Sequence, residues 1–242
     1  MSLQDLISRY EDSPEAHRAM WDHCLAQVQA TPYLKEHRDF VEAGGYGYGD
    51  RPFHWVWHCL ARELPPGFKF LEIGVFQGQT LSLMQLAARE CGKQAHIYGI
   101  TPLSSEGDKY ATHPDIDYVA RMAELHRRFN LKSPTLLCGQ SFDPRIQARA
   151  EEMGPFDLIY VDGCHDYEVA LDDLESYGLL VRPGGYLVLD DAGNDLELPA
   201  DLLPGGFKGL EDVNRALWNS RVVDHYFDQQ FAVGHLRVFR RV

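Results

Sequence analysis

Three aspartates follow two apolar runs near the middle of the chain. Asp162 closes the run 156–161, and Asp190 and Asp191 follow the run 185–189. If these runs are neighbouring parallel strands, about 4.8 Å apart, their carboxyl ends bring the three carboxylates into one crevice at the edge of the sheet. Because like charges there would repel, a bound cation is the economical explanation, and an oxygen-only ligand set suits Mg²⁺ better than zinc or copper. Alternatively, the aspartates cap the helices or loops that follow their strands.

A histidine, His165, comes three positions after the first of these aspartates. Imidazole titrates near neutral pH, so His165 can act as a general base that takes a proton from a bound hydroxyl. The alternative is a histidine at a helix start that bonds to nearby backbone.

His54 and His58 stand four apart on an expected helix, a spacing that can bind metal. They lack the glutamate of HExxH and have tryptophan neighbours, which favours a role in packing.

Another apolar run leads into a glycine turn, in the segment from Phe70 to Thr80. Gly74 and Gly78 let the backbone pass close to a ligand, and the N-terminus of the following helix offers free N–H groups to a carboxylate. Phe76 stands where a dinucleotide fingerprint needs glycine, which disfavours NAD. The chain has no P-loop and no complete G-x-S-x-G nucleophile elbow. An ordinary tight turn between a strand and a helix is the alternative.

Alternating apolar runs and helical patterns must position these residues. The apolar runs are short and largely continuous, as expected of strands that are covered on both faces. Their alternation with helices implies an α/β fold with a doubly wound, mostly parallel sheet and right-handed crossovers. The expected strands are 69–75, 96–100, 135–138, 156–161 and 185–189, and the expected helices are 79–90, 117–129, 145–153 and 166–180.

The two ends of the chain differ from this pattern. Residues 1–66 are expected to form an N-terminal helical cap, and residues 67–242 the main domain. In the cap, a helix is predicted from Pro14 to about Ala30 and another over about 52–63, separated by a glycine- and tyrosine-rich tract, 44–49, that is either a lid or a linker. At the other end, a helix near 211–218 precedes two expected strands, 222–232 and 236–241, whose two-residue turn makes them an antiparallel hairpin.

The composition argues against several classes of partner. The 242 residues carry a formal net charge of −13, which repels phosphate backbones and anionic lipids, so neither nucleic acid nor a membrane surface is an expected partner. No stretch approaches the roughly 20 apolar residues of a membrane helix, and the acidic N-terminus is unlike a signal peptide. The five cysteines are scattered, which argues against a disulfide framework or a zinc ribbon. We expect a reduced, cytoplasmic protein, for which a homo-oligomer is possible.

Two of these segments resemble the motifs of a known family. Glu72-Ile73-Gly74, with Gly78 after it, is similar to the first motif of class I S-adenosylmethionine-dependent methyltransferases, whose acidic residue and glycines hold the methionine part of the donor. The aspartate region resembles the metal-dependent O-methyltransferases that modify sugars of macrolide and aminocoumarin natural products. It also resembles the broader group with an Asp-Gly-x-His-x-Tyr signature followed by Pro-Gly-Gly and Asp. The resemblance extends over about 68–242.

This resemblance implies a Rossmann-like methyltransferase fold and a particular donor site. Relatives usually have an acidic residue at the end of the second strand that holds the ribose hydroxyls, but Thr101 stands there, which leaves the ribose contact open. Some sugar-modifying relatives have a carboxylate two residues beyond the first metal aspartate, where this chain has Cys164, so His165 is the better candidate base. The donor-binding residues implied are Glu72, Gly74, Gln77, Gly78, Thr80, Thr101, Ser141 and Asp162, the last shared with the metal.

The sequence thus predicts a methyltransferase that transfers a methyl group from S-adenosylmethionine to a hydroxyl of a small molecule. The metal is expected at Asp162, Asp190 and Asp191, with Asp162 and His165 as the catalytic residues. A sugar hydroxyl is favoured over a catechol, and the segment 101–117 is expected to wall the acceptor pocket. Two alternatives stay open: a metal-independent N- or O-methyltransferase, and a non-catalytic module that binds the donor.

Overall fold

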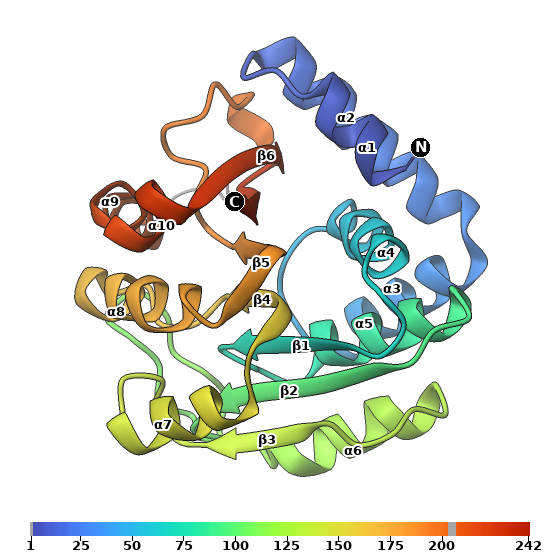
Figure 1. Cartoon of the computed structure of the whole chain (residues 1–242). Coiled ribbons are helices and arrows are strands. Elements are labelled where there is room, and N and C mark those ends of the chain that lie inside the picture. The colour runs from blue at the N-terminus through green and yellow to red at the C-terminus, as the bar shows by residue number, and fades with distance from the viewer. Residues whose placement is uncertain (1, 203–206) are drawn as a thin grey trace.

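A seven-stranded sheet in the order β3-β2-β1-β4-β5-β7-β6 forms the centre of the computed structural model, which describes residues 2–202 and 207–242. Strands β1 to β5 pair in parallel, whereas β7 pairs antiparallel with both β5 and β6. The predicted doubly wound sheet with a C-terminal antiparallel hairpin is therefore confirmed (Figure 1). The strands are β1 (Phe68–Ile73), β2 (Ala95–Thr101), β3 (Thr135–Cys138), β4 (Phe156–Val161), β5 (Val181–Leu189), β6 (Phe227–Val233) and β7 (Leu236–Arg241).

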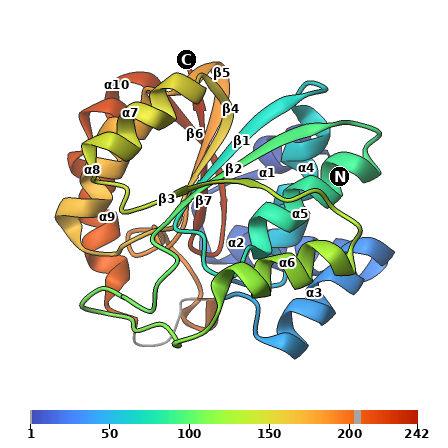
Figure 2. The same ribbon diagram turned by 90° about the horizontal axis from the view of Figure 1, so that it is seen from below.

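Helices cover both faces of this sheet: α7 to α10 lie on one side and α1 to α6 on the other (Figure 2). Side chains alternate across a strand. Leu158 and Tyr160 of β4 therefore pack into the core on the face covered by α1 to α6, whereas Ile159 and Val161 pack into the core beneath α8. None of the described helices has the length and apolarity needed to traverse a lipid bilayer. The helices of the main domain are α5 (Gln79–Glu90), α6 (Tyr118–Arg128), α7 (Pro144–Met153), α8 (Tyr167–Gly178), α9 (Gly209–Asn219) and α10 (Arg221–Tyr226), with a 3₁₀ turn at Ala200–Leu202.

The N-terminal segment is helical and consists of α1 (Leu3–Arg9), α2 (Pro14–Ala30), α3 (Pro32–Gly44) and α4 (Phe53–Glu63). The side chain of Ser13 accepts a hydrogen bond from the N–H of Ala16 and caps α2. Helix α3, which sequence reasoning did not delimit, starts at Pro32, where proline again serves as a first helical residue.

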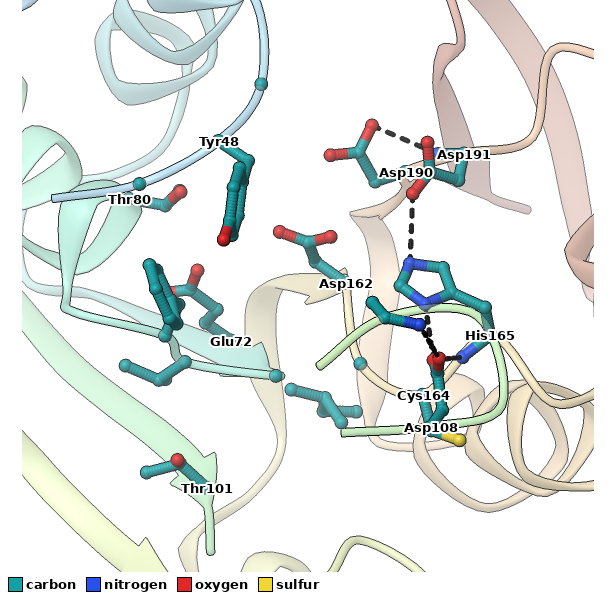
Figure 3. A pocket seen from close by; sticks show the side chains of 18 of the residues that line it. Tyr48, Glu72, Thr80, Thr101, Asp108, Asp162, Cys164, His165, Asp190 and Asp191 are labelled. Carbon is teal, nitrogen blue, oxygen red and sulfur yellow. Dashed lines mark hydrogen bonds and ion pairs between the residues drawn. The ribbon is translucent and has the colours of Figure 1, made fainter. Parts of the chain in front are cut away.

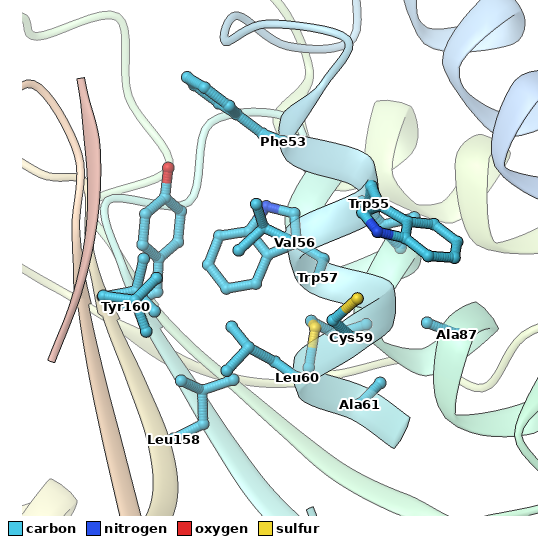
Figure 4. Close-up of a cluster of buried hydrophobic side chains, with 14 of the residues drawn as sticks. Phe53, Trp55, Val56, Trp57, Cys59, Leu60, Ala61, Ala87, Leu158 and Tyr160 are labelled. Carbon is cyan, nitrogen blue, oxygen red and sulfur yellow. The ribbon is translucent and has the colours of Figure 1, made fainter. Parts of the chain in front are cut away.

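Helix α4 joins the N-terminal helices to the sheet. Eight of its eleven residues are buried. The ring of Trp57 meets that of Tyr160 on β4 edge-to-face, with centroids 4.7 Å apart. Figure 4 shows Val56, Trp57 and Leu60 facing the sheet. These residues belong to the same apolar cluster as α1, α2 and α5, so the cap and the main domain share one core.

The predicted strand 222–232 was wrong in its first half. Residues Arg221–Tyr226 form helix α10, and the strand begins only at Phe227. The β-branched pair Val222-Val223 favours a strand by propensity, but both side chains are buried in the core beneath α8. The hydroxyl of Ser220 accepts from the N–H of Val223 and donates to Glu175, which caps the helix and ties it to α8.

Candidate active site

A pocket of about 940 Å³ opens beyond the carboxyl ends of the parallel strands. Open α/β sheets bind ligands at this edge, and the volume lies in the range of about 300–1,000 Å³ that is usual for small-molecule sites. Figure 3 shows side chains from several elements pointing into the pocket. Of the residues predicted to bind the donor, it is lined by Glu72, Gly74, Thr80, Thr101, Ser141 and Asp162.

The other two predicted donor residues, Gln77 and Gly78, are not among those that line the pocket. The Gln77 amide donates to the carbonyl of Gly45 at 3.1 Å, and its oxygen accepts from Arg121 at 2.7 Å. Gln77 therefore fastens the glycine- and tyrosine-rich tract to the turn after β1. Gly78 is the N-cap of α5 with φ +84°, and a Cβ there would lie 2.7 Å from the side chain of Met122.

Gly74 is required by the packing of two strand ends. Its φ is +94°, and a Cβ at this position would lie 1.9 Å from the carbonyl oxygen of Asp162. The N–H of Asp162 in turn donates to the carbonyl of Ile73 at 2.9 Å. The glycine therefore lets the backbone that follows β4 pass close beside the backbone that follows β1, and this contact fixes the position of Asp162 relative to the glycine turn.

Glu72 is a buried carboxyl at the base of the pocket, only 4% exposed. Burial raises its pKa to about 8, against the opposing effect of hydrogen bonds from the Thr80 hydroxyl and the N–H of Leu81. Its Oε2 atom has no hydrogen-bond partner among the described residues. Glu72 therefore retains a free acceptor that faces the pocket.

The three predicted metal ligands, Asp162, Asp190 and Asp191, all line this pocket. Burial, followed by the charges of Asp190 and Asp191, raises the pKa of Asp162 well above its ordinary value. Asp190 accepts a hydrogen bond from the hydroxyl of the buried Tyr160 at 2.6 Å. Asp191 has φ +52°, a strained backbone conformation for a residue that is not glycine. Two costs thus accompany the placement of these carboxylates: the repulsion between them, which raises the pKa of Asp162, and the strained backbone of Asp191.

The compact group of metal-ligating atoms, however, contains a residue that sequence reasoning missed. Atoms of Asp190, Asp191 and His235 lie within 4.8 Å of one another, and Asp162 is not part of this group. His235 stands in the turn between β6 and β7, which the sequence presented only as a hairpin turn. The only feature of the sequence that could have pointed to His235 is its place just before β7. Because β7 pairs with β5, the turn that carries His235 lies beside the end of β5.

His165 lies between two carboxylates. Its Nδ1 is 2.6 Å from Asp108 and its Nε2 is 3.0 Å from Asp191. Burial acts to lower the pKa of His165, but the hydrogen bonds to Asp108 and Asp191 outweigh burial and raise it to about 10. In this arrangement the imidazole keeps both ring protons near neutral pH, so the predicted role of general base requires Nε2 to be released from Asp191.

The part of the segment 101–117 that ends at His113 forms a wall of the pocket. Ten of the thirteen residues from Thr101 to His113 line it. The segment is tied to the rest of the domain by Asp108, which binds His165, and by Lys109 and Tyr110, which both donate to Asp212 on α9 at 2.5 and 2.7 Å.

The glycine- and tyrosine-rich tract 44–49 also lines the pocket, through Tyr46 to Gly49. The ring of Tyr48 stacks on Phe76 of the glycine turn, with centroids 5.0 Å apart. The guanidinium of the buried Arg38 donates to the carbonyls of Tyr48 and Gly49 and to the side chain of Gln79. These bonds fasten the tract across the turn after β1, so it covers the pocket rather than acting as a free linker.

His54 and His58 serve packing within the cap. His54 contacts His37 at 3.0 Å, and the other ring nitrogen of His37 contacts the Ser82 hydroxyl at 2.9 Å. His58 is hydrogen bonded to Tyr33 at 2.6 Å. Neither His54 nor His58 lines the pocket.

The comparisons with known proteins bear on this fold and on the family. Two solved structures share the fold of this chain. An S-adenosylhomocysteine-bound methyltransferase from Podospora anserina is 16% identical with a TM-score of 0.58, over 86% of this chain and 87% of the other. An O-methyltransferase from Bacillus cereus in complex with S-adenosylhomocysteine is 15% identical with a TM-score of 0.57, over 88% of this chain and 91% of the other. A candidate caffeoyl-CoA O-methyltransferase from Staphylococcus aureus has a TM-score of 0.63 at 12% identity, over 91% of this chain and 98% of the other.

Sequence comparison extends this result. An uncharacterised protein of Acanthamoeba polyphaga mimivirus is 26% identical over 197 residues, which cover 78% of this chain and 77% of the viral protein. A family model described as a methyltransferase domain matches residues 71–192, half of the chain, from the middle of β1 to just past Asp191. The chain therefore belongs to the methyltransferase-domain family, as the resemblance to class I S-adenosylmethionine-dependent methyltransferases predicted.

Proposed function

We propose that this methyltransferase transfers the methyl group of S-adenosylmethionine to a hydroxyl of a small molecule, assisted by a divalent ion. The observation that carries the proposal is one shared pocket: Glu72 and Gly74 of the glycine turn line it together with Asp162, Asp190 and Asp191. The similarity in fold to an O-methyltransferase in complex with S-adenosylhomocysteine supports this donor and this kind of acceptor atom.

The residues on the glycine-turn side fit the donor. The free Oε2 of Glu72 is a buried acceptor that suits an ammonium group. Thr101 at the end of β2 and Ser141 after β3 line the pocket and offer hydroxyls to the nucleoside part. Tyr48 and Phe76 supply an aromatic wall, and an aromatic face attracts a cation such as a sulfonium.

The acidic residues fit a divalent ion. Asp162 is buried beside Asp190 and Asp191, and their mutual repulsion is what raises its pKa in addition to burial. A cation held by these carboxylates would compensate that repulsion. The sequence alone favours Mg²⁺ for such an oxygen-rich site.

The chain's own residues then have definable tasks. S-Adenosylmethionine, when bound, supplies a methyl carbon on a positively charged sulfur, and a divalent ion, when bound, supplies the charge that lowers the pKa of an acceptor hydroxyl. Methyl transfer is an in-line displacement, so the two pocket walls mainly align the acceptor with the donor and exclude water. His165 accepts the hydroxyl proton at Nε2 when this atom is released from Asp191, while Asp108 holds the ring at Nδ1.

The lining of the acceptor side favours a sugar or a similar polyhydroxylated metabolite. Aromatic rings of Trp21, Phe53 and Phe207 share the pocket with the carboxylates of Asp50 and Asp108. Aromatic faces pack against the C–H face of a sugar ring, and carboxylates accept from its hydroxyls. We propose that the acceptor is such a small molecule of natural-product biosynthesis, in the cytoplasm, and neither a nucleic acid nor a membrane.

The test combines donor binding with metal removal. Calorimetry should detect binding of S-adenosylmethionine, and methyl transfer to a panel of glycosides and catechols should fall in excess EDTA and return with added Mg²⁺ or Mn²⁺. Asp191→Asn should lower turnover about 10- to 100-fold, whereas the control Asp224→Asn, at an exposed carboxylate on α10, should not change it. Full activity in EDTA would show a metal-independent methyltransferase, and the absence of donor binding would overturn the proposal.

A further inference from the structure

The turn between β6 and β7 places an imidazole against the acidic residues. We infer that His235 is a ligand of the divalent ion through Nδ1, so that the site is a mixed nitrogen and oxygen site. This inference rests on the proposed function, which requires an ion there. Its consequence is a preference for a first-row transition ion over Mg²⁺, because imidazole suits Fe, Ni and Zn, whereas Mg²⁺ prefers oxygen ligands.

The distances around Nδ1 match those between neighbouring ligands of one ion. Nδ1 lies 3.0 Å from Oδ1 of Asp190 and 3.2 Å from Oδ1 of Asp191. Two ligands at right angles, each about 2.1 Å from an ion, are about 3.0 Å apart. Nδ1 forms no hydrogen bond of ordinary geometry with either carboxylate. The nitrogen therefore faces both oxygens rather than pairing with one of them.

The ring is held in this orientation from the far side. Nε2 of His235 lies 3.4 Å from a carboxylate oxygen of Asp50, and the ring packs edge-to-face on Phe53 with centroids 5.0 Å apart. Metal-binding histidines commonly donate their second ring N–H to a carboxylate, which fixes the tautomer and leaves the other nitrogen for the ion. Asp50 is placed for that role, and it makes Nδ1 the free ligand atom.

Backbone contacts and burial fix where the ring stands. The N–H of Ala192 donates to the carbonyl of His235 at 3.0 Å, which ties the hairpin turn to the segment that carries Asp190 and Asp191. His235 is 5% exposed, so a polar ring is buried where it meets carboxylates on both sides. A buried, oriented imidazole aimed at two carboxylates is a second observation, independent of the acidic cluster, that points to a cation.

Metal titration tests the inference with a readout that is separate from turnover. Co²⁺ and Mg²⁺ affinities of the full chain are measured by calorimetry and, for Co²⁺, by its visible absorption. His235→Ala should weaken Co²⁺ binding at least about tenfold and change Mg²⁺ binding much less, because only the nitrogen ligand is lost. The control His225→Ala, an exposed histidine of α10, should alter neither affinity.

Electron–nuclear spectroscopy of the Mn²⁺-loaded protein tests ligation directly. The wild-type chain should show coupling to ¹⁴N that His235→Ala removes. His165 also lies near Asp191, at 3.0 Å, so His165→Asn controls for its imidazole and should keep the coupling. If His235→Ala does not fold, His235→Gln takes its place in both measurements.

The outcomes separate this inference from the proposed function. Unchanged Co²⁺ affinity in the variant, or ¹⁴N coupling that persists in it, would overturn the role of His235 while leaving a metal-assisted methyltransferase intact. A wild-type chain that binds the donor but no divalent ion would overturn both. In that case His235 only joins the hairpin to the acidic residues as an ion pair.

Discussion

The individual residues of this site are distinguished by the burial of their ionisable groups. Glu72 is surrounded by the core at the end of β1, and its carboxyl is partly satisfied by Thr80 and the N–H of Leu81. Asp190 raises the pKa of Glu72 further, although less than burial does. A carboxyl in this position is costly to ionise without a ligand, and this cost is what a positively charged donor group can relieve.

The pKa of Glu72 predicts how stability depends on pH. Because the native pKa is about 8, against an ordinary value of 4.5, the folded state binds more protons than the unfolded state between these two values. The free energy of unfolding should therefore fall as the pH rises from 5 to 8. Glu72→Gln removes this group, and the fall in the variant should be smaller by on the order of 3 kcal/mol.

Urea unfolding of the ligand-free protein at pH 5 and pH 8 measures the difference. Glu63→Gln, at an exposed position at the end of α4, is the matched control and should follow the wild-type curve. Parallel curves for the wild type and Glu72→Gln would contradict the raised pKa.

Among the elements, the tract 44–49 shows how a sequence without regular structure acquires a fixed place. Gln77 holds its start through the carbonyl of Gly45, and Arg38 holds its end through the carbonyls of Tyr48 and Gly49. Arg121 lies over the ring of Tyr46 at 3.7 Å. The wall of the donor site therefore depends on side chains from α3, α6 and the turn after β1.

Arg38→Met should loosen this wall without unfolding the domain. The variant keeps an apolar stem but loses charged hydrogen bonds to two carbonyls, each worth about 1.5–3 kcal/mol when buried. We expect about tenfold weaker binding of S-adenosylmethionine and faster hydrogen exchange of the amides in 45–50. Arg18→Met, which removes a partly exposed ion pair with Asp201, is the control. Unchanged exchange in 45–50 would show that Arg38 does not hold the tract.

On the scale of the whole molecule, the N-terminal helices complete the core instead of standing beside it. Leu6 of α1, Met20 of α2 and Leu60 of α4 belong to one apolar cluster with Phe70 and Leu158 of the sheet. At the predicted boundary, residue 66, the chain therefore changes from helices to an alternating α/β pattern, while the hydrophobic core continues across it. The cap also contributes Asp50 and Phe53, which contact His235.

A fragment of residues 67–242 should for this reason not fold as a stable monomer. Removal of the cap exposes the sheet face that carries Phe70, Leu158 and Tyr160, and each such side chain contributes about 1.5–3 kcal/mol when buried. Size-exclusion chromatography should show aggregation, and calorimetry should show no cooperative transition, whereas the full chain unfolds in one. A monomeric fragment with a cooperative transition would show that the main domain is independent of the cap.

The sequence predicted most of the sheet because its strands are short, apolar and bounded by turns. The ranges 135–138 and 156–161 agree with β3 and β4, and the predicted helix 79–90 agrees with α5. Propensity failed at Val222-Val223, where packing beneath α8 outweighs the preference of β-branched residues for strands. Local pattern is reliable only where the tertiary environment agrees with it.

The sequence by itself determined the family, the parallel sheet and the presence of three aspartates at its carboxyl edge, because each follows from local pattern and from the rule that parallel strands end together. Only the tertiary structure decided which groups stand around those aspartates. His235 reaches them through the register of the antiparallel hairpin, and Asp108 reaches His165 from a long connection. Contacts between segments so far apart in the chain depend on how the whole core packs, and no local pattern records them.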